Sequence, residues 1–308
     1  MKPVVLFHGA DIRHTDEPET AEQAEAAREL GCRIVELPRH FDDVQARALL
    51  DAIDAEPVPT WGFWLGYIVP LDVYRAVDEA LQAKNIFLVN DTERHQVVFE
   101  LDGALPYLRE LTPRTLMARH VDDAARAAAD IGYPVFLKGA LQSRKDMGWK
   151  ACVADNEDEL RHIVQQLEKR KDKHRGRVAV REVAPIIRRD VGASNFPVSR
   201  EFRVFLFDGE VMGFGYYWPY IIDGLYELTD AQQQDMLDVA RDAVRRLPTP
   251  WVSLDMGQLE DGRWIVIEPG DPQFSGLSFI ETKPTWRNLV AAVDRWPPPT
   301  APRAPVTD

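Results

Sequence analysis

The stretch "VIEPGDPQFSG", residues 266–276, places two carboxylates at a turn that follows an apolar strand. Glu268 and Asp271 stand on either side of Pro269-Gly270. Pro, Gly and Asp are common turn residues, so an ordinary turn is one explanation. A divalent-cation site is the other explanation, and the rest of the chain has to decide between them.

The residues before this stretch predict a β-hairpin. The runs "WVSLDMGQLE" (251–260) and "RWIVIEP" (263–269) have strand composition, and Asp261-Gly262 between them is a strong turn signal. This pairing makes Asp255 and Glu268 facing neighbours. Two such carboxylates repel one another unless a cation lies between them, which favours a metal site.

A second hairpin is predicted from "REFRVFLFDG" (200–209) and "EVMGFGYYW" (210–218), joined at Asp208-Gly209. Alternation places Glu201 and Arg203 on one face of the first strand, although any half-buried strand shows that pattern. The aromatic run "GFGYYWPY" (213–220) either lines an acceptor pocket or belongs to a core or an interface.

Basic residues cluster in "PVFLKGALQSRKDMGWKAC" (134–152). Lys138 ends an apolar strand, and Ser143, Arg144 and Lys145 lie on the loop before the strand expected at 150–154. Such a lysine and loop can hold phosphates, but an exposed hairpin tip has the same composition. In "AVREVAPI" (179–186), Glu182 could contact a nucleoside at a strand edge, or the segment is an ordinary strand ending at Pro185.

The first hundred residues alternate strand and helix patterns. This alternation predicts an α/β domain with a doubly wound parallel sheet. The strands are expected at 4–7, 33–37, 58–65 and 86–90, with helices at about 19–30, 42–54 and 71–85. Later in the chain, a strand is expected at 113–118 and helices at 121–132, 157–171 and 230–247. The loop "HGADIRHT" has no GxGxxG, which argues against a dinucleotide site.

Composition excludes several classes of protein. The 308 residues carry 37 Lys+Arg and 50 Asp+Glu, a net charge of −13, which argues against binding to nucleic acid or anionic membranes. Cys32 and Cys152 are the only cysteines, so a reducing compartment is expected. No signal peptide or membrane-spanning run is recognisable, and we expect a cytoplasmic protein.

The order of these pieces resembles the ATP-grasp superfamily over roughly residues 1–285. The segments "FLKGALQSRKDMGWKAC", "REFRVF" and "VIEPGDPQFSGL" resemble a less-studied clade known as ATP-grasp domain proteins. The resemblance implies an N-terminal α/β domain followed by two α+β ATP-grasp lobes. The implied boundaries are 1–111 for the pre-ATP-grasp domain, 112–292 for the ATP-grasp domain and 293–308 for a Pro-rich tail. Within the ATP-grasp domain, a lid-like subdomain covers about 112–185 and a metal-binding lobe about 186–292.

The resemblance also implies roles for individual residues. Lys138 would hold ATP phosphates, and the loop Ser143–Lys145 would cover them. Arg181, Glu182 and Val183 would meet adenine at the hinge, and Glu201 would bind ribose or assist the metal. Asp255 and Glu268 would bind Mg²⁺, and Arg203 and Lys145 would act in catalysis.

Three departures from the family pattern concern phosphate and metal handling. Gly270 stands where an Asn often provides a third metal ligand, and Asp271 is the expected replacement. Ser253 stands where an Arg is common, and Arg203 is expected to supply that charge. A second phosphate lysine is missing, with Arg94, His95 or Arg114 as candidate replacements.

These features predict an ATP- and Mg²⁺-dependent ligase that activates a carboxylate as an acyl phosphate for attack by an amine or similar nucleophile. The substrates would be small molecules or peptides, and a homodimer is one expected state. The sequence has no Gly-x-Ser-x-Gly and no metal-spaced His pair. It therefore does not indicate a hydrolase that uses a serine nucleophile or a histidine-bound metal. A small-molecule phosphotransferase and a catalytically silent nucleotide-binding module are the alternatives.

Overall fold

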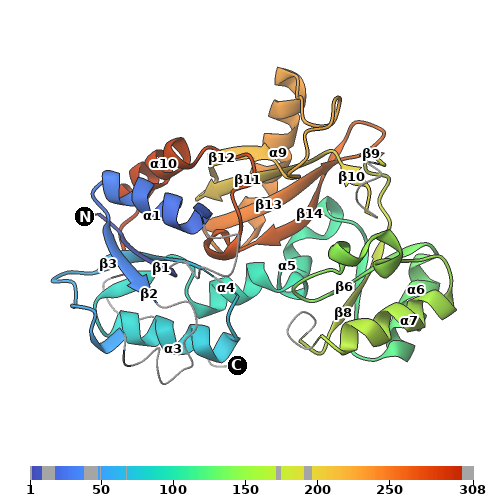
Figure 1. The fold of residues 1–308 in the computed structure, drawn as a ribbon, viewed down its shortest axis with the longest axis horizontal. Coiled ribbons are helices and arrows are strands. Elements are labelled where there is room, and N and C mark those ends of the chain that lie inside the picture. Colours follow the sequence, from blue (N-terminus) through green and yellow to red (C-terminus); the bar gives the residue numbers. More distant parts are fainter. Residues whose placement is uncertain are drawn as a thin grey trace.

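The computed structural model describes residues 2–8, 18–37, 48, 50–66, 68–170, 175–190 and 196–299. Over these ranges the strands form three four-stranded sheets and one two-stranded sheet, β9 (Arg188–Arg189) with β10 (Val198–Ser199). The three larger sheets occupy different parts of the molecule (Figure 1). Within the same ranges, no helix combines the length and the apolar character that crossing a membrane requires.

The first sheet is parallel, with strand order β2-β1-β3-β4. Its strands are β1 (Val4–His8), β2 (Arg33–Leu37), β3 (Thr60–Leu65) and β4 (Ile86–Leu88). Alternate side chains of β1 enter two different cores, which contain α1 (Pro18–Glu29) and α3 (Leu71–Gln82) respectively. The four predicted parallel strands are therefore confirmed. The predicted helix at 42–54 falls largely outside the described residues, so the doubly wound path stays a prediction.

The second sheet, which we call the lid sheet, is antiparallel with order β5-β8-β6-β7. Its strands are β5 (Thr115–Ala118), β6 (Val135–Gly139), β7 (Val153–Ala154) and β8 (Val178–Glu182). Helices α6 (Val121–Ile131) and α7 (Glu157–Glu168) share one apolar core with it. The strand predicted at 150–154 is shorter than expected, because residues 145–151 form two 3₁₀ turns around Gly148, which has φ +90°.

The third sheet, the body sheet, is antiparallel with order β12-β11-β13-β14. Its strands are β11 (Glu201–Phe207), β12 (Glu210–Tyr216), β13 (Trp251–Gln258) and β14 (Trp264–Gly270). Asp208 and Gly209 have φ of 49° and 81°, the positive values that a type I′ hairpin turn requires. Both predicted hairpins are confirmed, and Asp255 pairs with Glu268 in the observed register.

Helices cover both faces of the body sheet. One face packs on α9 (Asp230–Arg246), α4 (Thr92–Phe99) and α5 (Leu101–Leu108). The other face shares a core with the first sheet, α1 and α10 (Thr282–Asp294), and α1 and α10 lie side by side (Figure 1). The first sheet and the body sheet are thus joined by one continuous core.

The sequence analysis predicted no helix at the positions of α4, α5 and α10. The helices α4 and α5 form between Asp91, whose side chain caps α4, and the start of the lid sheet.

After α10, Trp296 stacks on Trp61 with ring centroids 4.8 Å apart. The beginning of the predicted Pro-rich tail therefore packs on the first sheet, while residues 300–308 lie outside the described ranges.

Candidate functional site

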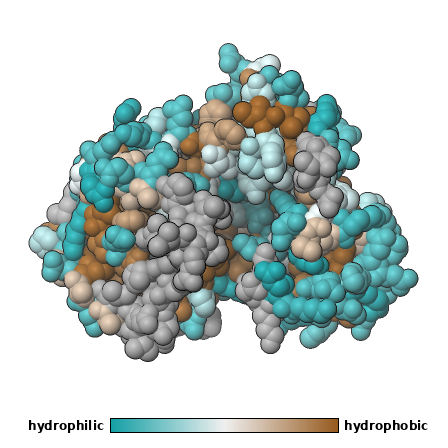
Figure 2. Space-filling view, viewed as in Figure 1, coloured by the Kyte–Doolittle hydropathy of each residue, from teal (hydrophilic) through white to brown (hydrophobic). Residues whose placement is uncertain are grey.

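Two adjoining cavities lie between the lid sheet and the body sheet. The small cavity measures about 70 Å³ and the large cavity about 450 Å³, and both are lined by Ser143, Lys145 and Glu268. The molecular surface is hollowed between the part that holds the body sheet and the part that holds the lid sheet (Figure 2). The shared residues show that the two cavities adjoin, and we call the pair the cleft.

Three charged residues form a row across neighbouring strands of the body sheet. Arg203 of β11 pairs with Asp255 of β13, which pairs with Glu268 of β14. The Arg203 guanidinium donates from Nε and Nη2 to the two oxygens of Asp255, at 2.8 and 3.0 Å. Burial opposes the charge of Arg203, but Asp255 raises the pKa of the guanidinium, so Arg203 stays charged.

Lys138 crosses from the lid sheet to the body sheet. It lies on β6, only 2% of it is exposed, and its ammonium pairs with the Glu268 carboxylate. Burial lowers the pKa of Lys138, and Glu268 opposes that effect. Burial would raise the pKa of Glu268, but the Lys138 charge lowers it overall. Glu268 therefore carries its negative charge at neutral pH.

Lys145 also points into the cleft from the loop after β6. Its ammonium lies 5.3–5.8 Å from the ring centroids of Phe196, Tyr217 and Trp218. Burial would lower its pKa, but Glu201 and other nearby anions raise it above the usual value. This position favours the phosphate interpretation of the loop over an exposed hairpin tip.

The aromatic run at 213–220 serves two purposes. Tyr217 lines the large cavity, whereas Tyr216 is buried in the core of the body sheet. Arg203 lies over the Tyr217 ring at 4.8 Å. Tyr217 follows the last residue of β12 and still donates to Glu201 O at 3.0 Å, so the two neighbouring side chains point to opposite faces as in a strand.

The small cavity contains the residues that were predicted to meet a nucleoside. Arg181, Glu182, Val183 and Glu201 all line it. Glu201 is 2% exposed, and its Oε2 accepts a hydrogen bond from Ser199 at 2.8 Å. Its Oε1 has no hydrogen-bond partner among the described residues, and burial raises the pKa of the carboxyl. Glu201 is thus available to a ligand in this cavity.

Arg181 connects the lid sheet to the body sheet. Its guanidinium donates to Ile267 O at 2.9 Å, and to the hydroxyls of Thr112 at 2.9 Å and Thr115 at 3.0 Å. Burial lowers the pKa of Arg181 to about 10, so it stays charged at neutral pH. Its side chain forms part of the cavity wall while it ties β8 to β14.

Sequence reasoning missed several residues of the small cavity wall, and three of them carry large aromatic or charged side chains. Trp149, Arg188 and Phe196 line it, and the Arg188 guanidinium lies 5.1 Å from the Trp149 ring centroid. Trp149 gave the only signal in the sequence, as a large aromatic residue in a polar loop.

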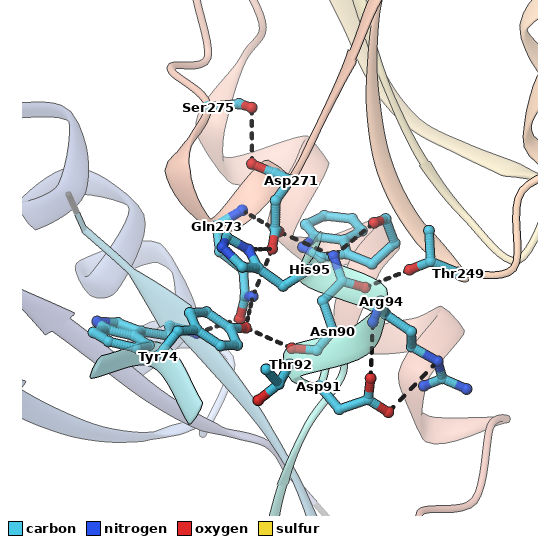
Figure 3. Close-up of polar contacts among 12 residues, drawn as sticks. Tyr74, Asn90, Asp91, Thr92, Arg94, His95, Thr249, Asp271, Gln273 and Ser275 are labelled. Atoms are coloured by element: carbon cyan, nitrogen blue, oxygen red, sulfur yellow. Dashed lines mark hydrogen bonds and ion pairs between the residues drawn. The ribbon is translucent and has the colours of Figure 1, made fainter. Parts of the chain in front are cut away.

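Asp271 belongs to the wall of the large cavity, but its carboxylate is held by buried donors (Figure 3). It is fully buried, and its Oδ1 accepts from Asn90 at 3.0 Å and from the Gln273 backbone at 3.1 Å. Its Oδ2 lies 2.8 Å from His95 Nδ1 and 3.1 Å from Gln273 Nε2. These donors use both oxygens, so we leave Asp271 out of the proposed metal ligands.

The same network links the turn to the first sheet. Gln273 accepts a hydrogen bond from Trp64 N at 2.7 Å and donates to the Tyr74 hydroxyl at 2.8 Å. Asn90 donates to Trp251 O at 2.8 Å. The turn that follows β14 is therefore held by the ends of β3, β4 and β13.

None of the three suggested replacements for a second phosphate lysine lines either cavity. His95 is committed to Asp271, Arg114 pairs with Asp130, and Arg94 donates to Val89 O at 2.9 Å. Lys145 is the second lysine that the structure places in the cleft.

Packing around Gly270 accounts for two departures from the family pattern together. A Cβ at this position would lie 2.7 Å from Ser253 Oγ and 3.0 Å from Ser275 Oγ. These two hydroxyls are hydrogen bonded at 2.8 Å. The serine at 253 and the glycine at 270 therefore form one packed unit that leaves no room for an asparagine ligand.

The remaining carboxylates fit a magnesium ion that arrives with a nucleotide. Asp255 and Glu268 face each other on neighbouring strands. Over the described ranges, no group of three or more His, Cys, Asp or Glu residues is arranged to hold a metal. Because Mg²⁺ commonly uses one or two carboxylates plus substrate phosphates, this pair suits Mg²⁺ bound to ATP.

We expect Asp271→Asn to act on stability rather than on metal binding. The amide would turn an NH₂ group toward donors that now face a carboxylate, at a cost of about 1–3 kcal/mol in the free energy of unfolding. Urea unfolding without metal would measure this loss. ADP formation by the folded variant should keep its wild-type Mg²⁺ dependence. A raised Mg²⁺ requirement with unchanged stability would instead identify Asp271 as a ligand.

Solved structures with the same fold are ATP-grasp proteins. D-alanine–D-alanine ligase from Bacillus anthracis, complexed with ATP, matches at 13% identity and a TM-score of 0.62, over 96% of this chain and 97% of that one. A RimK domain ATP-grasp protein from Sphaerobacter thermophilus DSM 20745 matches at 14% identity and 0.56, over 94% and 99%. The ATP-grasp ligase PsnB, complexed with a precursor peptide and AMPPNP, matches at 14% identity and 0.55, over 94% and 97%.

The fold, with its cleft between two antiparallel sheets, is that of an ATP-grasp protein. The model of the ATP-grasp domain, R2K clade family 3, matches residues 119–289, and the chain belongs to this family. A search of curated proteins finds no significant match.

Proposed function

We propose that this protein is an ATP- and Mg²⁺-dependent, ADP-forming ligase. It would convert a carboxylate into an acyl phosphate, which an amine or similar nucleophile then attacks. The observation that carries this proposal is the junction of the two cavities, where Lys138, Lys145 and Arg203 meet the neighbouring carboxylates Asp255 and Glu268.

The wall of the small cavity carries groups that suit the nucleoside part of ATP, and the cavity of about 70 Å³ would have to widen to admit it. Its wall includes the strand end at Glu182 and Val183, which can offer backbone groups to adenine. The unpartnered oxygen of buried Glu201 can accept hydrogen bonds from ribose hydroxyls. The phosphates would then extend toward Lys138, Ser143 and Lys145, which lie at or near the junction with the large cavity.

Asp255 and Glu268 would hold Mg²⁺ once the phosphates are in place. The ion, when bound, neutralises charge on the transferring phosphoryl oxygens. Arg203 is held by Asp255 at the wall of the large cavity, where it can orient a substrate carboxylate toward the phosphates. Such chemistry requires positioning and charge neutralisation rather than a nucleophilic side chain.

The large cavity would receive the carboxylate and the nucleophile. Its volume of about 450 Å³ is within the range for small-molecule sites, and its opening can also admit the end of a peptide. The carboxyl ends of parallel strands are common ligand sites. The carboxyl end of β3 lies beside this cavity, where the Gly66 N–H donates to Gln273 O at 3.1 Å.

The test is the release of ADP and phosphate from Mg-ATP in the presence of pooled carboxylic acids, amino acids and peptides. A ligase releases ADP and phosphate only when an acid and a nucleophile are both supplied. ADP together with a phosphorylated acid that persists would instead indicate a phosphotransferase. Tight ATP binding without turnover over the whole panel would indicate a silent binding module.

A further inference from the structure

Besides other polar and small residues, the wall of the large cavity contains a charged part and an apolar part. One part is charged and contains Lys145, Arg203, Asp255 and Glu268. The other part, which we call the apolar wall, consists of four residues from separate segments: Ile68, Phe99, Leu141 and Phe274. This division bears on which acids the proposed ligase can accept, so the inference below rests on the proposed function.

The apolar wall is held in place by packed rings. Phe99 stacks on His95 with centroids 4.6 Å apart, and His95 stacks on Tyr74 at 4.0 Å. Phe274 packs against this column, 5.9 Å from Phe99 and 5.3 Å from His95. Two of the four wall residues, Phe99 and Phe274, are therefore packed on the buried His95, which pairs with Asp271 (Figure 3).

The charge behind this wall is already neutralised. The Arg175 guanidinium lies 6.0 Å from the Phe99 ring centroid, but it pairs with the buried Glu100 carboxylate. Arg177 pairs with the same carboxylate and with Asp102, so two carboxylates balance the two guanidinium groups. These pairs leave Arg175 little attraction for an anion on the cavity side of Phe99.

The apolar wall begins next to the charged part. Lys138, which pairs with Glu268, also donates to Leu141 O at 3.3 Å. On the other side, Phe274 adjoins Ser275, whose hydroxyl contacts Ser253. A carboxylate bound near Arg203 and Lys145 would therefore direct its carbon chain along the wall.

We infer that the acyl substrate is a monocarboxylic acid whose carboxylate is attached to an apolar aliphatic or aromatic group. Such a group covers Ile68, Phe99 and Phe274 and removes apolar surface from water. A second carboxylate in the same position would lose its hydration, and the four residues of the apolar wall offer it no cationic partner, which disfavours dicarboxylic acids.

Direct binding of probe acids tests this inference independently of turnover. Ligand-observed NMR on the protein with Mg²⁺ and a non-hydrolysable ATP analogue would give dissociation constants for hexanoate, hydrocinnamate and succinate. We expect the two apolar acids to bind at least about tenfold more tightly than succinate. Equal or tighter binding of succinate, or no binding of any of the three acids, would overturn the inference.

A matched pair of variants locates the binding site. Ile68 is 39% exposed at the cavity, whereas Ile221 is 58% exposed between β12 and α9, away from it. Ile68→Asn should weaken the binding of hexanoate by roughly fivefold to tenfold, and Ile221→Asn should leave it unchanged. Unchanged binding in Ile68→Asn would remove Ile68 and the apolar wall from the site.

Turnover separates this inference from the proposed function. Selective binding of apolar acids with no ADP release from any acid and amine pair would contradict the ligase and leave the inference standing. ADP release that depends on succinate but not on hexanoate would support the ligase and contradict the inference.

Discussion

Glu268→Gln is expected to lower Mg²⁺-dependent ADP formation by about 100-fold or more, because it removes one of two carboxylates proposed to hold the metal. The same change is expected to destabilise the metal-free protein by roughly 1–3 kcal/mol, the cost of leaving a buried polar group without its partner. The second effect comes from Lys138, which is 2% exposed and would be left in the interior without its anionic partner.

The direction of this stability change distinguishes two effects, relief of repulsion between the carboxylates and loss of an ion pair. Repulsion between Asp255 and Glu268 alone predicts that losing one charge leaves the metal-free protein as stable or more stable. In the structure each carboxylate has its own cation, Arg203 for Asp255 and Lys138 for Glu268. The loss of an ion pair should therefore outweigh the relief of repulsion.

The dependence on pH provides a further check. Burial would raise the pKa of Glu268, but Lys138 holds it below its usual value in the folded protein. The stabilisation is therefore complete above the usual glutamate pKa and is lost as the pH falls through the lowered value. The difference in unfolding free energy between wild type and Glu268→Gln should narrow in acid, as measured by urea unfolding.

Two controls complete the experiment. Glu260→Gln changes an exposed glutamate on the same hairpin and should affect neither turnover nor stability. Combining Glu268→Gln with Lys138→Met removes both charges and should recover part of the lost stability. Full activity in Glu268→Gln would rule out the metal site, leaving the ordinary-turn explanation.

Lys138→Ala is expected to weaken binding of Mg-ATP by roughly 10–100-fold, the effect of losing a charged hydrogen bond to a phosphate. Lys138→Met should show the same loss with less damage to packing, because it keeps the apolar stem of the buried side chain. Calorimetric titration with ATP and Mg²⁺ would measure both variants, with circular dichroism to confirm folding.

The metal response should separate a phosphate contact from a general loss of structure. Removing Lys138 frees Glu268 from its ion pair, so Mg²⁺ without nucleotide should bind no more weakly than to wild type. Lys150→Met is the matched control, since Lys150 is exposed on the same lobe and pairs with Asp155. Unchanged ATP affinity in folded Lys138→Met would remove this lysine from the phosphate site.

Local sequence was sufficient to predict the parts of the site that lie within one hairpin. Asp208-Gly209 and Asp261-Gly262 specify tight turns, and the two-residue period of a strand then determines which side chains face each other. For this reason the pairing of Asp255 with Glu268 and the shared face of Glu201 and Arg203 followed from the sequence. The four parallel strands followed in the same way from alternating strand and helix patterns.

Contacts between distant segments were decided only by the tertiary structure. Lys138 and Glu268 are 130 residues apart and meet because the lid sheet packs across the body sheet. Helices α4, α5 and α10 carry weak local signals, and their positions depend on the cores that they complete.

The direction of the Asp271 side chain also depends on contacts with distant segments. The sequence places a carboxylate three residues after Glu268, within reach of a shared cation. Its direction depends on Asn90 and His95, donors from the first hundred residues that no local pattern connects to the turn. A fully buried carboxylate turns toward the donors that can replace its lost hydration, and here those donors lie in the core behind the cleft.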